Sequence, residues 1–388
     1  MKTPATFAVG SVHSSLLTAA FLISSSALAA PATGSNAMNP DLSLDGLFSL
    51  SQFNRDNPVV FDGGHDPKFN GFNLQQVELT FGSNVDPYFR GDANVVLTAE
   101  GIEVEEAYGT TLDLPANLQL KAGQFYTAFG RHNPTHPHQW DWANKPLVLG
   151  RFFGGDGLRN LGLQASWLTP LPWYSELIVS GQNSTGKTVQ SFRADGGTVS
   201  GMRNPGDYLY LARTNNFVGL SDSLSLNAGA SFLMGPNNTA ATARTRILGG
   251  DLYLKYREPH SVSFVALQAE VLRRLYDTDT ASSLTDSGAT IHAMVRLGEP
   301  WQRWMIGLRY DWTDPKAAPV QTAVAIGGAD PDTAQRWRIS PVITFYPTEF
   351  SKLRLQYDYD KPADLAYAQQ AVHLEFEILM GAHGAHKF

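Results

Sequence analysis

The stretch at residues 304–312 reads WMIGLRYDW and alternates between two kinds of side chain. Its even positions are apolar or aromatic, with Trp304 at one end and Trp312 at the other, and its odd positions are mostly charged or small. Successive side chains of a β-strand point to opposite faces, so this stretch is expected to be a strand with one apolar and one polar face. Aromatic residues at both ends of the apolar face are typical of a strand that crosses a bilayer, because tryptophan and tyrosine suit the headgroup interfaces.

The same alternation recurs in three segments that follow this stretch. Their apolar faces consist of Trp337, Ile339, Ile343 and Phe345, then Leu353, Leu355, Tyr357 and Tyr359, then Val372, Leu374, Phe376 and Ile378. The interleaved positions are mostly charged or polar. Four consecutive strands of this kind predict an all-β fold, a transmembrane antiparallel β-barrel with a polar lumen.

Candidate strands along the whole chain number sixteen. They fall near residues 41–53, 71–82, 88–99, 101–113, 118–129, 158–169, 173–181, 208–219, 223–234, 245–257, 261–274, 288–298, 301–313, 335–346, 351–360 and 370–380. Short turns and mostly long loops alternate between them, as they do in outer-membrane barrels, which have an even strand number. We therefore predict sixteen strands, both termini in the periplasm and no plug domain. About fourteen or eighteen strands remain alternatives, because Pro341 interrupts one segment and residues 261–274 lack a clear apolar face.

The first residues of the chain have the pattern of a signal peptide. Lys2 precedes an apolar region at residues 16–23, and Ala27-Leu28-Ala29 matches an A-x-A cleavage site. The predicted division is a signal peptide at 1–29, a periplasmic lead at 30–40 and the barrel at 41–388. This division places the protein in the outer membrane of a Gram-negative bacterium.

Composition excludes several other classes of protein. No later segment offers about 18 consecutive apolar residues, which excludes a helical membrane protein. The chain has no cysteine, so its fold relies on no disulfide and no thiolate can hold a metal. The formal net charge of −7 argues against nucleic acid as a partner.

The connection at about 131–157 is expected to be the third outer loop. In sixteen-stranded porins, which this pattern resembles, that loop folds into the lumen and forms the constriction. Here it holds three of the ten histidines together with several aromatic residues, which argues against disorder. The predicted constriction residues are Arg131, His132, His136, His138, Asp141, Arg151 and Asp156.

The histidines of this loop allow three interpretations. They can hydrogen-bond within a packed loop, form a constriction sensitive to charge or pH, or bind a metal. The predicted metal ligands are His132, His136, His138 and Asp141, a set that suits zinc or another borderline divalent ion. No cofactor is expected to be required.

Charged residues on the polar face of the strands are expected to line the pore. They are Arg303, Arg309, Arg336, Arg338 and Arg354 on the late strands, with Glu103 and Glu105 on an early strand. Charged walls set ion selectivity, because the field across a narrow aqueous channel acts on every passing solute. The alternative is that these charges pair with one another.

A barrel enzyme is the rival class, and the sequence does not favour it. Neither G-x-S-x-G nor H-E-x-x-H occurs. Asp62, His65 and Asp66 lie close together in the first outer loop, where a glycine-rich, solvated turn is the simpler interpretation. We therefore predict that the protein is not an enzyme.

Three stretches resemble a bacterial group commonly labelled zinc-regulated, TonB-dependent outer-membrane receptors, whose barrels look porin-like. They lie at residues 130–140 (GRHNPTHPHQW), 151–158 (RFFGGDGL) and 381–388 (GAHGAHKF). The resemblance implies an outer-membrane uptake role with zinc as a candidate solute. It matches His132, His136 and His138 to that role.

The function predicted from these observations is a porin-like channel for small hydrophilic solutes or ions, with the histidine-rich loop as its constriction. A zinc-selective uptake channel is one alternative, and a barrel enzyme or structural adhesin is another. The expected partners are outer-membrane lipid and lipopolysaccharide, and a homotrimer is a candidate assembly. The terminal Phe388 resembles the signal by which the barrel assembly machinery recognises its substrates.

Overall fold

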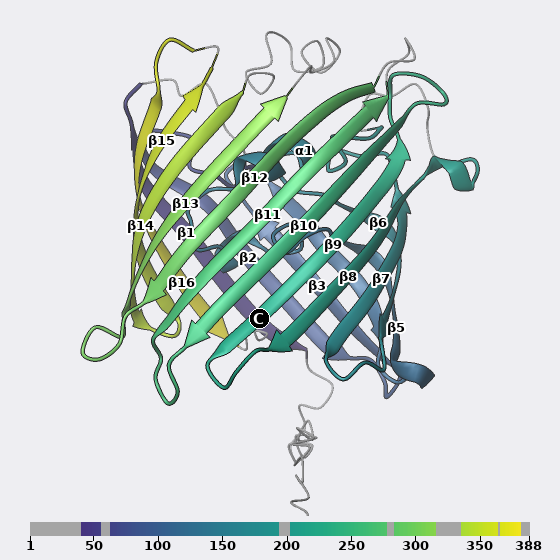
Figure 1. Ribbon diagram of the computed structural model, residues 1–388, viewed down its shortest axis with the longest axis horizontal. Coiled ribbons are helices and arrows are strands. Elements are labelled where there is room, and N and C mark those ends of the chain that lie inside the picture. Colours follow the sequence, from purple (N-terminus) through teal and green to yellow (C-terminus); the bar gives the residue numbers. More distant parts are fainter. Residues whose placement is uncertain are drawn as a thin grey trace, which may run out of the picture. The chain divides into compact units, whose positions relative to one another are not determined.

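Sixteen antiparallel strands close into one barrel (Figure 1). The computed structural model describes residues 40–55, 63–193, 202–277, 283–315, 335–363 and 365–381. Each strand pairs with its neighbours in the sequence, and the first pairs with the last. The predicted fold class and strand count are confirmed, and a barrel of fourteen or eighteen strands is excluded.

The elements follow one another with short helices only in the connections. The strands are β1 (Asp41–Phe53), β2 (Gly71–Asn84), β3 (Phe89–Leu97), β4 (Ile102–Thr111), β5 (Leu118–Tyr126), β6 (Arg159–Leu168), β7 (Tyr174–Asn183), β8 (Tyr208–Gly219), β9 (Leu224–Pro236), β10 (Arg244–Arg257), β11 (Phe264–Asp277), β12 (Ser283–Arg296), β13 (Trp304–Pro315), β14 (Arg336–Thr348), β15 (Ser351–Pro362) and β16 (Gln369–Gly381). The helical turns are η1 (Pro115–Asn117), η2 (Pro137–Gln139), α1 (Leu147–Phe153) and η3 (Pro205–Asp207). No helix among the described residues is long and apolar enough to cross a membrane.

The predicted alternation of faces is confirmed on β13. Ile306 and Leu308 are 47% and 51% exposed on the outside, whereas Arg309 and Asp311 are 1% and 0% exposed and point into the barrel. Apolar side chains outside and charged side chains inside reverse the arrangement of a soluble protein. A lipid bilayer is the environment that covers such an outer surface.

Two irregularities noted in the sequence have local explanations. Pro341 faces outward, and the ladder between β14 and β15 is formed on either side of it, at Ile339 and Val342. On β11 the inward positions include the buried apolar residues Ala266 and Leu272, which pack in the lumen instead of facing water. The apolar face of β11 was therefore hard to recognise because both of its faces carry apolar side chains.

The start of β1 lies beside the end of β16, since Ser43 pairs with Gly381. Both lie at the end of the barrel that carries the short turns, as predicted for a barrel whose termini share one side (Figure 1). In the part of the chain that the structure describes, no separate plug domain accompanies the barrel. The predicted signal peptide, almost all of the periplasmic lead and Phe388 lie outside the described residues.

Candidate functional site

The connection between β5 and β6, residues 127–158, folds into the barrel and is called the lumen loop here. The amide of Gly130 donates to Ser231 Oγ on β9 over 3.1 Å, and the indole of Trp142 donates to the carbonyl of Ser340 on β14 over 2.8 Å. These contacts join the loop to walls on both sides of the lumen. Figure 1 shows α1, which belongs to this loop, between the front and back strands.

Apolar side chains hold part of the lumen loop in place. All seven residues of α1 are buried, and Phe129, Val148 and Phe152 belong to a cluster that includes inward residues of β10 and β11. Burial of such side chains is favourable at about 25 cal/mol per Å² of apolar surface. The loop therefore has its own apolar core inside a polar barrel.

Three glycines of the wall make room for this core. A Cβ at Gly249 would lie 2.6 Å from the ring of Phe129, and one at Gly288 would lie 2.5 Å from the side chain of Val148. A Cβ at Gly307 would lie 3.1 Å from the ring of Trp142. At Gly249 and Gly288 a Cβ would force the loop side chain to move, so glycine is needed there, whereas at Gly307 the Trp142 ring would have to give by a few tenths of an ångström.

Basic residues of the opposite wall bind the backbone of the lumen loop. They donate to four carbonyls between residues 138 and 145: Lys352 to that of His138 (2.6 Å), Arg354 to that of Trp140 (2.5 Å), Arg309 to that of Asn144 (2.8 Å) and Arg338 to that of Lys145 (2.5 Å). The predicted arginine row therefore exists on the polar face, but the loop lies on it and does not face it across an open lumen.

The arginines of this row also pair with acids of the wall. Arg309 Nε lies 2.9 Å from Asp311, Arg336 Nη2 lies 2.5 Å from Asp360, and Arg354 pairs with Glu375. Pairing of the wall charges was the alternative left open by the sequence, and the geometry agrees with it. Arg303 does not belong to the row, because β13 begins only at Trp304 and Arg303 is exposed in the turn before it.

The predicted constriction residues Arg131, Arg151 and Asp156 lie at separate points of the lumen loop. Arg131 donates to Gln268 over 3.2 Å, and its guanidinium lies 4.1 Å from the centre of the Tyr253 ring. Arg151 is buried within α1, and the backbone carbonyl of Asp156 accepts from Arg159 over 3.3 Å. Burial raises the pKa of Asp141.

The four predicted metal ligands are not brought together. The ring of His132 lies 4.7 Å from that of His292 on β12, and burial together with Arg309 and Arg131 lowers the pKa of His132 to about 3. His132 is therefore neutral, and its environment differs from that of the other two histidines of the loop. His136 and His138 stack 5.7 Å apart and face acids on the other side of the lumen.

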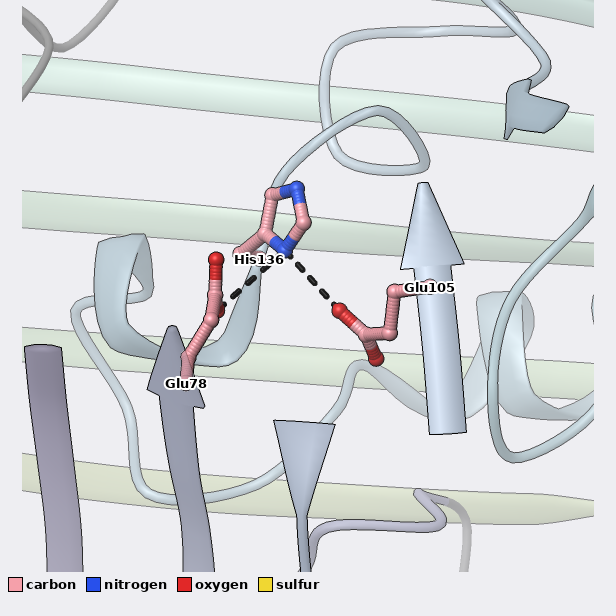
Figure 2. Close-up of side chains that lie close together, drawn as sticks. All are labelled: Glu78, Glu105 and His136. Carbon is pink, nitrogen blue, oxygen red and sulfur yellow. Dashed lines mark hydrogen bonds and ion pairs between the residues drawn. The ribbon is translucent and has the colours of Figure 1, made fainter. Parts of the chain in front are cut away.

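Three histidines and three glutamates form a buried group, called the acid–histidine cluster here. Its members are His65 from the first outer loop, Glu78 from β2, Glu105 and Glu106 from β4, and His136 and His138 from the lumen loop. His136 Nδ1 lies 2.9 Å from Glu105 Oε2 and 3.3 Å from Glu78 Oε2 (Figure 2). His136 Nε2 lies 2.9 Å from Glu106, and His138 Nδ1 lies 3.0 Å from Glu78. His65 Nε2 completes the group at 3.2 Å from Glu105.

Two β-bulges explain why neighbouring polar residues point inward together. The pairing of β1 with β2 skips Gln75, and the pairing of β3 with β4 skips Glu105. Each extra residue shifts the alternation of its strand by one position, so Gln75 and Gln76 are both buried, and so are Glu105 and Glu106. Bulges commonly re-aim side chains at functional sites, and both of these lie beside the cluster.

Sequence reasoning found some members of the cluster and missed others. Glu105, His136 and His138 were predicted to lie in the lumen, and Glu103 lies beside the cluster, where it pairs with Arg159 over 2.5 Å. Glu106 was missed because strict alternation places it on the lipid face, and Glu78 was not singled out. Two adjacent acids in a membrane strand are a signal of a bulge, since strict alternation would expose one of them to lipid.

The first outer loop is not the solvated turn that the sequence suggested. His65 and Asp66 are each 7% exposed, and Asp66 accepts hydrogen bonds from the amides of Gly63 and Lys145, both over 2.9 Å. The turn is therefore packed against the lumen loop. Asp62 lies outside the described residues.

The glutamates make the histidines of the cluster basic. Burial alone would lower the pKa of His136, but Glu78, Glu105 and Glu106 outweigh it and hold the pKa well above its ordinary value. Burial also lowers the pKa of His65 and of His138, but Glu105 outweighs it for His65 and Glu78 outweighs it for His138, so both pKa values are raised. The cluster therefore attracts cations, whether these are protons or metal ions.

A substitution at the start of the lumen loop tests its seating. Gly130 has a φ of +61°, and a Cβ there would lie 1.7 Å from the carboxylate of Glu270. We expect Gly130→Val to lower the free energy of unfolding by roughly 1–2 kcal/mol from the left-handed backbone alone. Displacement of Glu270 is expected to add to this loss, and urea unfolding in lipid vesicles measures the sum.

Gly181→Ala is the matched control for this substitution, because Gly181 has an ordinary backbone and its Cβ would meet Tyr210 at an ordinary 3.5 Å. Proteolysis within residues 127–158 should increase for Gly130→Val and stay unchanged for the control. Equal stability of the two variants would contradict the described path of the loop.

Comparisons with known proteins identify the family of the chain and relate its fold to solved structures. No family model matches the chain. A protein of Aquifex aeolicus described as uncharacterized is 31% identical over 390 residues, covering 91% of this chain and 80% of that protein.

Solved outer-membrane barrels share the fold at low sequence identity. The outer membrane channel DcaP of Acinetobacter baumannii is 13% identical with a TM-score of 0.58, covering 88% of this chain and 97% of that one. An anion-selective porin from Comamonas acidovorans is 11% identical with a TM-score of 0.55, covering 88% and 100%. OmpT of Vibrio cholerae, solved in a trimer form, is 10% identical with a TM-score of 0.53, covering 88% and 99%.

These findings correct the resemblance noted in the sequence. Plugged outer-membrane transporters close about 22 strands, whereas this barrel has sixteen. The porin-like part of the resemblance is supported, and the label of TonB-dependent receptor is not. The chain belongs to the same family as the uncharacterized Aquifex aeolicus protein, and its described residues have the barrel fold of outer-membrane porins.

Proposed function

We propose that this chain is a non-enzymatic outer-membrane channel for small hydrophilic solutes or ions, narrowed by the lumen loop. The observation that carries the proposal is the position of this loop across the lumen of a closed sixteen-stranded barrel. A barrel of this size encloses an aqueous channel, and an inserted loop reduces its width. The proposed channel requires no cofactor.

The proposal includes a location for the passage. The late strands are covered by the lumen loop, whereas some inward residues of β3, β5 and β10, namely Asp92, Lys121 and Lys255, are partly exposed. Lys121 shares the inner face of β5 with the buried Phe125, and its amine lies 4.1 Å from the centre of the Tyr108 ring. Lys255 lies on the inner face of β10, 4.6 Å from the centre of the Phe264 ring. We propose that solutes pass between these two lysines.

The biological setting is part of the same proposal. The apolar outer surface would contact outer-membrane lipid and lipopolysaccharide after export through a cleaved signal peptide. The last strand and Phe388 would direct assembly by the barrel assembly machinery. OmpT of Vibrio cholerae has a trimer form, and we propose a homotrimer for this chain too.

Planar bilayer recordings test the channel and its passage together. The refolded chain is expected to give ohmic current steps, and Lys121→Glu combined with Lys255→Glu is expected to shift the reversal potential in a salt gradient toward cation preference. Lys187→Glu, an exposed position in the connection between β7 and β8, is the control and should leave the reversal potential unchanged.

The outcomes separate two parts of the proposal. A correctly folded barrel that carries no current would overturn the channel function. Current steps with a reversal potential that the paired lysine substitutions leave unchanged would overturn only the proposed route.

A further inference from the structure

We infer that Glu78, Glu105 and His136 bind a divalent transition-metal ion of the zinc class, which links the lumen loop to the barrel wall. Glu78 and Glu105 come from β2 and β4, and His136 comes from the loop (Figure 2). The inference does not depend on whether the barrel conducts.

The spacing of the donor atoms suits a small coordination sphere. One ligand atom from each of the three residues can be chosen so that all lie within 4.8 Å of one another. Zinc binds nitrogen and oxygen at about 2.0–2.2 Å, so adjacent ligands of a tetrahedral site are about 3.4 Å apart. His136 Nδ1 already lies 2.9 Å and 3.3 Å from the two carboxylate oxygens. Only small movements would be needed to admit an ion between them.

The chemistry of the donors favours a transition metal over calcium or magnesium. One imidazole and two carboxylates match the mixed nitrogen and oxygen sets that hold zinc. Calcium takes six to eight oxygen ligands, and magnesium prefers oxygen ligands in octahedral geometry. His138 is not one of the three residues whose ligand atoms lie within 4.8 Å of one another, and its Nδ1 contacts the site through Glu78 Oε2 at 3.0 Å.

The surroundings hold these donors in the orientation that a metal site needs. Metal-binding histidines generally present their second nitrogen to a carboxylate, and His136 Nε2 lies 2.9 Å from Glu106 Oε2. Asn94 donates to Glu78 Oε1 over 2.6 Å, and Gln76 donates over 3.2 Å to Glu78 Oε2, the oxygen that also faces His136. The bond from Asn94 to Oε1 leaves Glu78 Oε2 directed at Nδ1 of His136, and a bound ion would share that oxygen with Gln76.

Glu105 is supported in the same way, by hydrogen bonds to its other oxygen. Tyr126 donates to Glu105 Oε1 over 3.3 Å, and Arg159 donates to it over 3.2 Å. Glu105 Oε2 is the atom that faces His136. Each proposed ligand therefore has a supporting contact on the side away from the proposed ion.

The charge of the cluster also points to a cation. Three buried carboxylates lie within contact distance of the imidazoles, and Arg159 is a permanent cation in contact with Glu105. Buried carboxylates repel one another unless positive charge is placed among them. A divalent ion between Glu78 and Glu105 would supply that charge, in competition with protons on His136, His138 and His65, which contact the same carboxylates.

Calorimetric titration of the full chain, refolded in detergent and stripped with a chelator, tests the site. We expect one Zn²⁺ per chain to bind at micromolar concentration or below, while Mg²⁺ and Ca²⁺ give no saturable binding. Glu105→Gln and Glu78→Gln keep the size of the side chain and are expected to abolish this binding. Glu106 supports His136 and accepts the amide of Tyr126 but is not a proposed ligand, so Glu106→Gln is expected to weaken zinc binding by roughly 10–100-fold.

Two controls exclude zinc bound elsewhere. His260→Gln changes an exposed histidine in a turn, and His383→Gln with His386→Gln changes the histidines near the carboxyl terminus. Both controls should bind zinc like the unaltered chain. Heat-modified gel mobility verifies that every variant is folded, and zinc is expected to slow proteolysis of residues 127–158 only when the site is intact.

Zinc binding that survives Glu105→Gln and Glu78→Gln but disappears with the tail histidines would overturn the inference. So would the absence of saturable zinc binding by the folded chain, which would leave a proton as the occupant of His136. A barrel that conducts but fails this test loses only the metal site, and one that binds zinc but carries no current loses only the proposed channel.

Discussion

Removing the lumen loop is expected to raise the single-channel conductance by roughly threefold or more, because the loop occupies much of the lumen of a barrel wide enough for an aqueous channel. The deletion replaces residues 128–157 with a short glycine–serine turn. Such a turn can close the hairpin, because Tyr126 pairs with Arg159 and the amide of Thr127 donates to the carbonyl of Leu158 over 2.9 Å.

The barrel itself is expected to survive this deletion. The three wall arginines that bind the loop also have acidic partners in the wall, since Arg309 and Arg338 pair with Asp311 and Arg354 pairs with Glu375, and water would replace the loop carbonyls as acceptors. Bilayer recordings of the deletion measure the conductance directly. Shortening the connection between β9 and β10 at residues 237–243 is the control and should leave the conductance unchanged. Equal conductance with and without the lumen loop would show that the passage avoids it.

Arg354→Met is expected to destabilise the seated loop by roughly 3–5 kcal/mol, because it removes one partner of a buried ion pair. Arg354 and Glu375 are each 1% exposed and pair with one another, and Arg354 also donates to the carbonyl of Trp140 over 2.5 Å. The substitution leaves the Glu375 carboxylate in the wall without this guanidinium. Urea unfolding in lipid vesicles and proteolysis within residues 127–158 measure the loss.

The double variant Arg354→Met with Glu375→Gln is the matched control for this prediction. It removes both charges, so most of the lost stability should return, and the cycle of single and double variants isolates the energy of the pair. A double variant as unstable as Arg354→Met would show that the bond to the loop carbonyl matters more than the ion pair.

The fold was predictable from the sequence because the signal for each strand is local. Alternation in segments such as 304–312 needs only neighbouring residues, and it gave sixteen strands with most boundaries within a few residues. The largest difference is at β12, which begins at Ser283 and not near 288, since its polar start pairs with the end of β11. Arg303 was misplaced for the same kind of reason, as alternation alone does not show where a strand begins.

The functional site was only partly predictable, because it depends on contacts between distant segments. The histidines of the lumen loop were conspicuous, but nothing local shows that His132 turns toward His292 while His136 turns toward Glu105. The bulge at Glu105 turns the side chain of Glu106 into the lumen. This bulge is a shift in the pairing of β4 with β3, which the sequence of β4 alone does not show. The burial of His65 also arises only when the first outer loop meets the lumen loop.

The manner in which the wall holds the lumen loop has a consequence for how the protein can change. Lys352, Arg354, Arg309 and Arg338 grip peptide carbonyls, which every amino acid provides. These four bonds therefore do not depend on which amino acids stand at 138, 140, 144 and 145. The side chains of Trp142 and Asn144, in contrast, make wall contacts of their own that a replacement would lose. A redesigned loop for a new solute would thus keep Trp142 and Asn144 and could vary positions whose only bond to the wall is a peptide carbonyl.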